Sequence, residues 1–173
     1  MTDICAGRDY RGRLKEVDVG AFDLVLGCDN YGGNHWNLFA AWPKSGKISY
    51  LNPLGESVPH LEKIKRNWRN FCYQRAMSWK TSMPREWFIV IPNHPKQHDS
   101  YNCGVFCMKF AEVLLRDQSW QFKMKSEDLI SYRKMIGQLL LSDSDELDNG
   151  WCRICGTFAG DTQWVCKSYF VDF

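Results

Sequence analysis

The run from Cys103 to Arg116, CGVFCMKFAEVLLR, most constrains the fold, because it follows a polar, turn-prone loop and is apolar over most of its length. Its apolar residues recur at helical spacing and leave Lys109, Glu112 and Arg116 on the other side. This periodicity predicts a helix over 103–116. Cys103 would lie on its first turn, where unpaired N–H groups and the positive end of the helix dipole favour a thiolate.

A cysteine in that position has two interpretations. Free cysteines are most often small buried apolar residues, and Cys107, one turn further along the same run, fits that role better than Cys103. Alternatively, Cys103 is a nucleophile whose thiol loses its proton to a base. Gln97, six residues upstream, carries a side-chain amide of the kind that stabilises an oxyanion.

A cysteine nucleophile needs a histidine, and the chain has four. His60, His94 and His98 lie at an expected helix start or in the loop before the cysteine. His35 opens residues 35–42, which predict a strand, and residues 47–51 predict the next one. A histidine at a strand start is commonly only a surface residue. A hairpin, however, brings the start of its first strand near the end of its second, so we expect His35 to touch Asn52.

These residues occur in a fixed order along the chain: His35-Trp36, then Asn52, then Gln97, then Cys103-Gly104. The order and spacing resemble the ubiquitin-like-protein-specific (SUMO/sentrin, ULP-type) cysteine proteases, which are related to adenovirus protease. The resemblance spans about residues 20–120. It implies a papain-like α+β fold, with a central mixed sheet flanked by helices and the nucleophile at a helix N-terminus. It also implies hydrolysis of the bond after the Gly-Gly tail of a ubiquitin-like protein of the SUMO or NEDD8 class.

The resemblance assigns a role to each residue. Cys103 is the nucleophile, and His35 is the general base that later protonates the leaving amine. Gln97 donates its side-chain amide to the oxyanion beside the Cys103 backbone N–H, a type of contact worth about 3 kcal/mol of barrier. Trp36 helps to form a narrow channel for the diglycine strand, although an aromatic residue packed inside a strand is an equal alternative. No cofactor and no metal ion enter this mechanism.

Two departures from the family pattern favour an alternative, a catalytically weak relative that only binds a ubiquitin-like protein. The family usually has aspartate at the position of Asn52. Asparagine can accept the Nδ1–H of His35 through its Oδ1 and fix the tautomer, but it lacks the charge that stabilises an imidazolium, so we expect reduced activity. Family members also carry a longer region before the histidine strand, and the chain is expected to be N-terminally truncated relative to them.

Composition narrows the remaining classes. The chain has 173 residues, 45% of them hydrophobic, enough for one substantial core. With 22 basic and 20 acidic residues, no nucleic-acid or anionic membrane surface is required, and no apolar run approaches the roughly 20 residues of a membrane span. The basic residues within 63–75 alternate with apolar ones, as on the exposed face of an amphipathic helix. Eight scattered cysteines and no signal-peptide core favour a nuclear or cytoplasmic protein without disulfides.

Further segments complete the predicted order. Strands are expected over 22–27 and 86–91, and helices over 59–79 and 126–141, with Ser126 as the N-cap of the last. Residues 1–141 therefore form the predicted catalytic domain. Residues 142–150 are acidic and turn-rich and predict a linker, and residues 151–173 are a partial cysteine-rich tail.

The tail resembles the opening of a PHD finger, a histone-tail reader, so a chromatin-associated reader is a third functional alternative. Cys152 and Cys155 form a C-x-x-C pair, and Cys166 follows Trp-Val. The position three residues after Cys166 is Tyr169, and three thiolates without a fourth ligand make a poor structural zinc site. We expect a degenerate finger that holds no metal.

Overall fold

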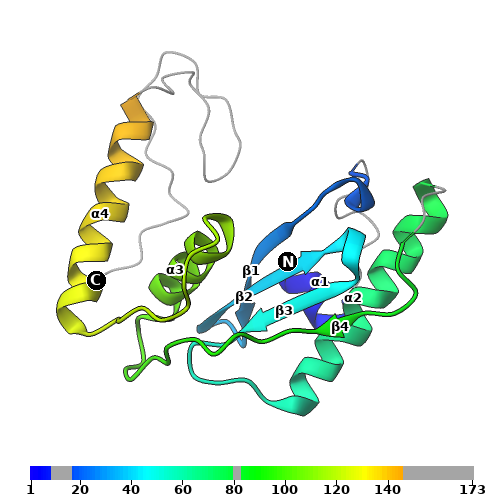
Figure 1. The fold of residues 1–173 in the computed structure, drawn as a ribbon, viewed down its shortest axis with the longest axis horizontal. Coiled ribbons are helices and arrows are strands. Elements are labelled where there is room, and N and C mark those ends of the chain that lie inside the picture. The colour runs from blue at the N-terminus through cyan, green and yellow to red at the C-terminus, as the bar shows by residue number, and fades with distance from the viewer. Residues whose placement is uncertain (9–16, 80–82, 146–173) are drawn as a thin grey trace. The chain divides into compact units, whose positions relative to one another are not determined.

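The computed structural model describes residues 1–8, 17–79 and 83–145 (Figure 1). The chain divides into two units, residues 1–129 and 130–173. The elements of the first unit are the helices and strands α1 (Thr2–Ala6), β1 (Val25–Tyr31), β2 (His35–Trp42), β3 (Lys47–Leu51), α2 (Val58–Trp79), β4 (Phe88–Ile89) and α3 (Cys103–Leu115), with short 3-10 helices η1 (Val19–Ala21) and η2 (Pro43–Ser45). A last helix, α4 (Ser126–Asp145), begins in the first unit and continues into the second.

The four strands form one mixed sheet in the order β1-β2-β3-β4. β1, β2 and β3 are antiparallel neighbours, and β4 lies parallel to β3. The β1–β2 hairpin turns through Gly32 and Gly33, whose φ angles of 67° and 84° suit glycine. β2 extends beyond the end of β3, because the last β2–β3 pair joins Leu38 to Leu51. His35 therefore lies beside the chain that leaves β3.

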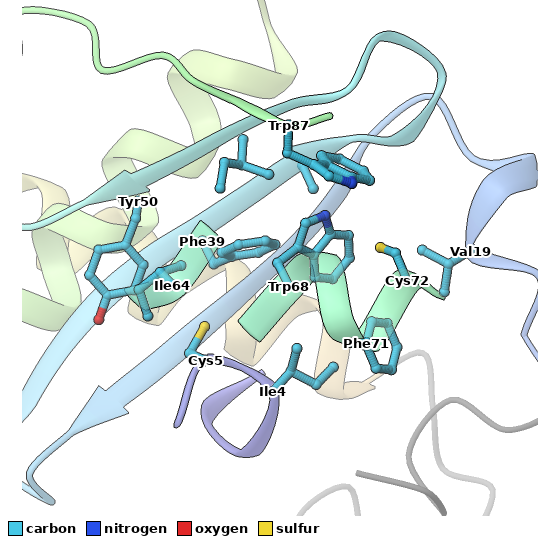
Figure 2. Close-up of a cluster of buried hydrophobic side chains, with 12 residues drawn as sticks. Ile4, Cys5, Val19, Phe39, Tyr50, Ile64, Trp68, Phe71, Cys72 and Trp87 are labelled. Atoms are coloured by element: carbon cyan, nitrogen blue, oxygen red, sulfur yellow. The ribbon is translucent and has the colours of Figure 1, made fainter. Parts of the chain in front are cut away.

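The main hydrophobic core lies between the sheet and α2, where Trp68 is central (Figure 2). The Trp68 ring centroid is 4.8 Å from that of Phe39 on β2 and 5.6 Å from that of Trp87, which precedes β4. Alternate β2 residues, Leu38 and Ala40, point to the opposite face and are also buried, and α3 packs against this strand. β2 is thus covered by helices on both faces, which explains its continuous apolar sequence.

The predicted bounds of the central hairpin are confirmed, since β2 and β3 cover residues 35–42 and 47–51. α2 and α3 also agree with prediction to within one residue at each end. β1 instead covers 25–31 rather than 22–27, because every residue from Val25 to Tyr31 pairs with β2, including its polar half. β4 has only two residues of the predicted 86–91, because its pairing is limited to Lys47 and Ile48 at the start of β3.

α4 corrects two predictions about the C-terminal part of the chain. Ser126 is the first residue of this helix rather than its N-cap. At the N-terminal end of the helix, the backbone N–H of Lys125 donates to Asp128 Oδ2 at 3.0 Å. The helix runs to Asp145, so residues 142–145 of the predicted linker are helical. The rest of that linker and the tail with Cys152, Cys155 and Cys166 lie outside the described residues.

Within residues 1–8, 17–79 and 83–145, no three His, Cys, Asp or Glu side chains are grouped so that they could hold a metal ion. Among the helices of the same residues, none combines the length and apolarity needed to cross a membrane.

Candidate active site

The predicted contact between His35 and Asn52 is present. The Nε2 atom of His35 lies 2.8 Å from Oδ1 of Asn52, and the backbone N–H of Leu54 donates to the same oxygen at 2.9 Å. Because an amide oxygen only accepts, Nε2 carries the hydrogen and Nδ1 of the neutral ring is left to take up a proton. The prediction that Nδ1 faces Asn52 is therefore wrong, because Nε2 is the ring nitrogen that faces it. The rotation of the ring decides this point, and a strand pattern carries no information about it.

Cys103 is the first residue of α3 and is buried. Its neighbour Gly104 faces Trp36, since a Cβ built on Gly104 would lie 3.8 Å from Trp36 Cδ1. The residues next to His35 and to Cys103 are therefore neighbours in space. In the described part of the chain, the His35 ring hydrogen-bonds to Asn52 and not to the Cys103 thiol. Such thiol contacts are often long without substrate and tighten when it binds.

Trp36 differs from the other aromatic residues of the sheet. Its side chain is 40% exposed, whereas Phe39 and Tyr50 on the same sheet are buried. The indole thus lies at the surface over the first turn of α3 rather than in a core. This placement argues against the alternative of an aromatic residue packed inside the strand.

Cys107 behaves as the apolar residue that its position predicted. Burial raises the pKa of its thiol, and the nearby Cys28 and Cys103 raise it further. A thiol with a raised pKa is protonated at neutral pH and is a poor nucleophile. Both cysteines of α3 are buried, but they differ in position: Cys103 is the first residue of the helix, next to the Gly104 that faces Trp36, and Cys107 lies one turn further along.

Gln97 lies beside the turn that carries Asn52, because its backbone N–H donates to the Pro53 carbonyl at 2.8 Å. Its side chain is buried, and Nε2 donates to the Asp99 carbonyl at 2.6 Å and to Asp99 Oδ1 at 3.1 Å. The Oε1 atom is buried and has no hydrogen-bond partner among the described residues. The structure therefore brings Gln97 to the site, with its amide N–H groups directed to Asp99.

Asp99 organises the loop that leads into α3, and the sequence analysis missed it. Its Oδ1 accepts the backbone N–H groups of Tyr101 at 3.0 Å and Asn102 at 2.8 Å, and Oδ2 accepts the Asn102 amide at 2.7 Å. Burial opposes ionisation of this carboxyl, but these hydrogen bonds outweigh it and lower the pKa of Asp99. An aspartate in a polar loop is a recognisable signal for such a turn, because its side chain can accept the backbone N–H two residues further on.

A second missed group is the cluster of Glu56, His94 and Lys96. Oε1 of Glu56 lies 2.6 Å from Nε2 of His94 and accepts the Asn52 backbone N–H at 2.9 Å, and Oε2 accepts Lys96 Nζ at 2.7 Å. Burial would raise the pKa of Glu56, but hydrogen bonds from His94, Lys96 and Asn52 prevail and lower it to about 2. Glu56 and His94 are 38 positions apart, and no sequence pattern predicts their pairing.

A mixed sheet flanked by helices, with a histidine–amide pair near a cysteine at a helix N-terminus, is the arrangement of the papain-like cysteine protease fold. The family model for the Ulp1 protease family, C-terminal catalytic domain, matches residues 8–143. The chain belongs to this family, and the predicted α+β fold is confirmed. Among curated proteins, no sequence matches the chain.

Solved structures show the same fold at low sequence identity. A structure of the SUMO protease Ulp1 with its catalytic cysteine oxidised to a sulfenic acid is 20% identical, with a TM-score of 0.65, and the match covers 80% of this chain and 64% of that one. The C-terminal Ulp1 protease domain in complex with Smt3, the yeast ortholog of SUMO, is 19% identical, with a TM-score of 0.64 and coverages of 78% and 59%. The Ulp1-like SUMO protease catalytic domain of Chaetomium thermophilum is 20% identical, with a TM-score of 0.60 and coverages of 80% and 53%. The chain thus spans less than two thirds of these relatives.

Proposed function

We propose that the chain is a cysteine peptidase that cleaves the bond after the diglycine tail of a ubiquitin-like protein. The observation that carries the proposal is the His35–Asn52 hydrogen bond of 2.8 Å, formed near the first turn of α3 in a member of the Ulp1 family. The SUMO class is the favoured substrate, because one of the similar structures is a Ulp1 protease domain in complex with Smt3. The NEDD8 class is the alternative.

His35 and Cys103 perform the proton transfers in this mechanism. Nδ1 of His35 removes the thiol proton, and the thiolate forms at the N-terminus of α3, where the helix dipole stabilises it. Sγ then attacks the carbonyl carbon of the terminal glycine, and the resulting oxyanion collapses as His35 returns the proton to the leaving amine. Attack by water on the thioester releases the glycine carboxylate and restores the thiol. Asn52 holds Nε2 throughout, so that Nδ1 stays directed to the reaction.

Gln97 has to turn its amide away from Asp99 before it donates to the oxyanion. Leaving Asp99 gives up hydrogen bonds with a net worth of about 1 kcal/mol each, whereas a donor to the oxyanion contributes about 3 kcal/mol. The exchange is favourable only when the negative charge is present. Gln97 would therefore contribute to the transition state and little to substrate binding.

The test is covalent labelling by SUMO, NEDD8 and ubiquitin that carry an electrophile at the C-terminus. We expect the SUMO probe to form an adduct with the wild-type protein, no adduct with Cys103→Ala, and slower labelling of His35→Ala. Cys28→Ala removes an exposed cysteine outside the site and should label like the wild type. If folded wild-type protein reacts with none of the three probes, the proposed activity is wrong.

A second candidate function is binding of a ubiquitin-like protein without turnover. Two observations favour it, the amide in place of a carboxylate at Asn52 and the engagement of the Gln97 amide by Asp99. This candidate predicts measurable affinity for an unmodified ubiquitin-like protein together with no adduct in the labelling experiment.

A further inference from the structure

Two residues of the candidate site, Asn52 and Gln97, lie on loop segments that are distant in sequence. Asn52 follows β3, and Gln97 follows β4. Three hydrogen bonds join the segments, and Glu56 makes two of them, to His94 at 2.6 Å and to Lys96 at 2.7 Å. The third runs from the Gln97 backbone N–H to the Pro53 carbonyl at 2.8 Å. Glu56 is therefore the main side chain that cross-links the two segments.

Glu56 also shapes the turn on which Asn52 lies. Its Oε1 accepts the Asn52 backbone N–H at 2.9 Å, and the Asn52 carbonyl accepts the Gly55 N–H at 2.9 Å. The Asn52 side chain is held in turn by the Leu54 N–H, which leaves Oδ1 aimed at His35 Nε2. A continuous series of hydrogen bonds thus runs from Glu56 through Asn52 to the candidate base.

The groups around Glu56 are hydrogen-bond donors, and they are best paired when its side chain is a charged carboxylate. The side chain is 13% exposed, and its two oxygens accept N–H groups from His94, Lys96 and Asn52. The other ring nitrogen of His94, Nδ1, lies 3.0 Å from the Pro95 carbonyl, and the ring is buried against Phe110 with centroids 4.5 Å apart. A neutral acid at position 56 would turn one of the two accepting oxygens into a hydroxyl donor, and an aliphatic side chain would leave all three donors without an acceptor.

We propose that Glu56 is a positioning residue, whose carboxylate, anchored by His94 and Lys96, holds Asn52 and Gln97 in place relative to His35 and Cys103. It touches no reacting atom and acts through Asn52 and through the segment 94–97. This role of Glu56 rests on the proposed function, because Asn52 and Gln97 are catalytic residues only if the chain is a peptidase. Because a small misplacement of a catalytic group slows a reaction strongly, the effect belongs to kcat rather than to KM.

The experiment compares Glu56→Ala, Glu56→Gln and a matched control, Glu62→Ala. Glu62 also forms an ion pair with a lysine, Lys65 at 2.7 Å, but on the surface of α2. We expect Glu56→Ala to lower kcat for a SUMO–diglycine substrate by about tenfold with KM nearly unchanged. Glu56→Gln keeps an acceptor for the Asn52 N–H and should recover part of the loss. The control should match the wild type in both constants.

A second readout needs no activity. Nitrogen-15 NMR of His35 reports which ring nitrogen carries the hydrogen in the neutral ring. We expect the Nε2–H tautomer in the wild type and a mixture of tautomers in Glu56→Ala. If Glu56→Ala does not fold, Glu56→Gln carries both measurements, with a smaller loss of kcat and a partial shift of tautomer.

Equal kcat values and an unchanged His35 tautomer in the folded variants would overturn the proposal. If the wild type fails to react with any substrate, the proposed function fails, and the tautomer measurement alone decides whether Glu56 positions the pair. A loss of stability without a change in kcat or tautomer would assign Glu56 a purely structural role and would also overturn it.

Discussion

Among single residues, Asn52 is the one whose chemistry most affects the expected activity. Its Oδ1 receives two N–H groups, from His35 and from Leu54, and it donates nothing to either. A carboxylate oxygen would accept the same two hydrogens in the same positions. The amide therefore preserves the geometry of a histidine–carboxylate pair and lacks only the charge.

Replacing Asn52 by aspartate tests that conclusion. We expect Asn52→Asp to raise, or at least preserve, the rate of adduct formation with a SUMO probe, because the added charge stabilises the imidazolium formed during attack. Asn52→Ala removes the acceptor and should lower the rate. The measurement is the second-order rate constant of labelling at fixed pH. Complete loss of labelling in Asn52→Asp would show that the role assigned to Asn52 is wrong.

Among the elements, α3 depends on the loop before it. The N-cap residue, Asn102, makes no side-chain capping hydrogen bond, and the Asp99 carboxylate instead accepts the backbone N–H groups of Tyr101 and Asn102. Asp99 thus closes the turn that leads into the helix and at the same time accepts from the Gln97 amide. The start of α3 and the oxyanion donor are linked through one side chain.

Asp99→Ala should separate these two effects. We expect the free energy of unfolding to fall by about 1 kcal/mol or more, because two backbone N–H groups of this turn lose their acceptor. The Gln97 amide loses its hydrogen bond to Asp99 Oδ1 but keeps the one to the Asp99 carbonyl, so it is held less tightly, and the labelling rate of the folded fraction should not fall in proportion. Urea unfolding and probe labelling on the same samples measure both quantities.

Asp128→Ala is the matched control for Asp99→Ala, since Asp128 accepts one backbone N–H at the start of α4 and has no contact with Gln97. It should lower stability without changing the labelling rate. Unchanged stability of Asp99→Ala would contradict the role given to Asp99.

At the scale of the whole molecule, the Glu56 cluster couples stability to pH. The pKa of Glu56 is lowered from 4.5 to about 2 in the folded protein, so the Glu56 carboxylate binds a proton less readily there than in the unfolded chain. A group with a lowered pKa stabilises the folded protein at pH values above the pKa that it has in the unfolded chain. For Glu56, this contribution to the free energy of unfolding is lost as the pH falls through 4.5 toward 2. After allowance for partial solvent screening, the contribution is on the order of 2 kcal/mol.

Unfolding by urea at pH 7, 4 and 3 checks this expectation. The wild type should lose stability more steeply than Glu56→Gln over this range, because only the wild type has the carboxylate to protonate. The difference between the two proteins removes the contribution of Asp99, whose pKa is also lowered. Parallel pH dependences in the two proteins would refute the assignment of this acid sensitivity to Glu56.

The sequence alone determined the parts of this protein that depend on local chain pattern. The predicted bounds of the strands 35–42 and 47–51 agree with the observed ones, because turn-forming residues mark both ends of each apolar segment. The contact of His35 with Asn52 followed from this hairpin, since pairing between consecutive strands is local. The start of α3 at Cys103 followed from the point where a polar loop gives way to apolar residues at helical spacing.

Only the tertiary structure decided the contacts between distant segments. The pairing of Glu56 with His94 depends on where the turn after β3 meets the segment after β4, and the ring nitrogen that faces Asn52 depends on a side-chain rotation. The direction of the Gln97 amide depends on the loop that Asp99 closes. A one-dimensional pattern records which residues can become buried or can pair with near neighbours. It does not record which polar groups meet when the sheet and helices pack, and this packing completes the site.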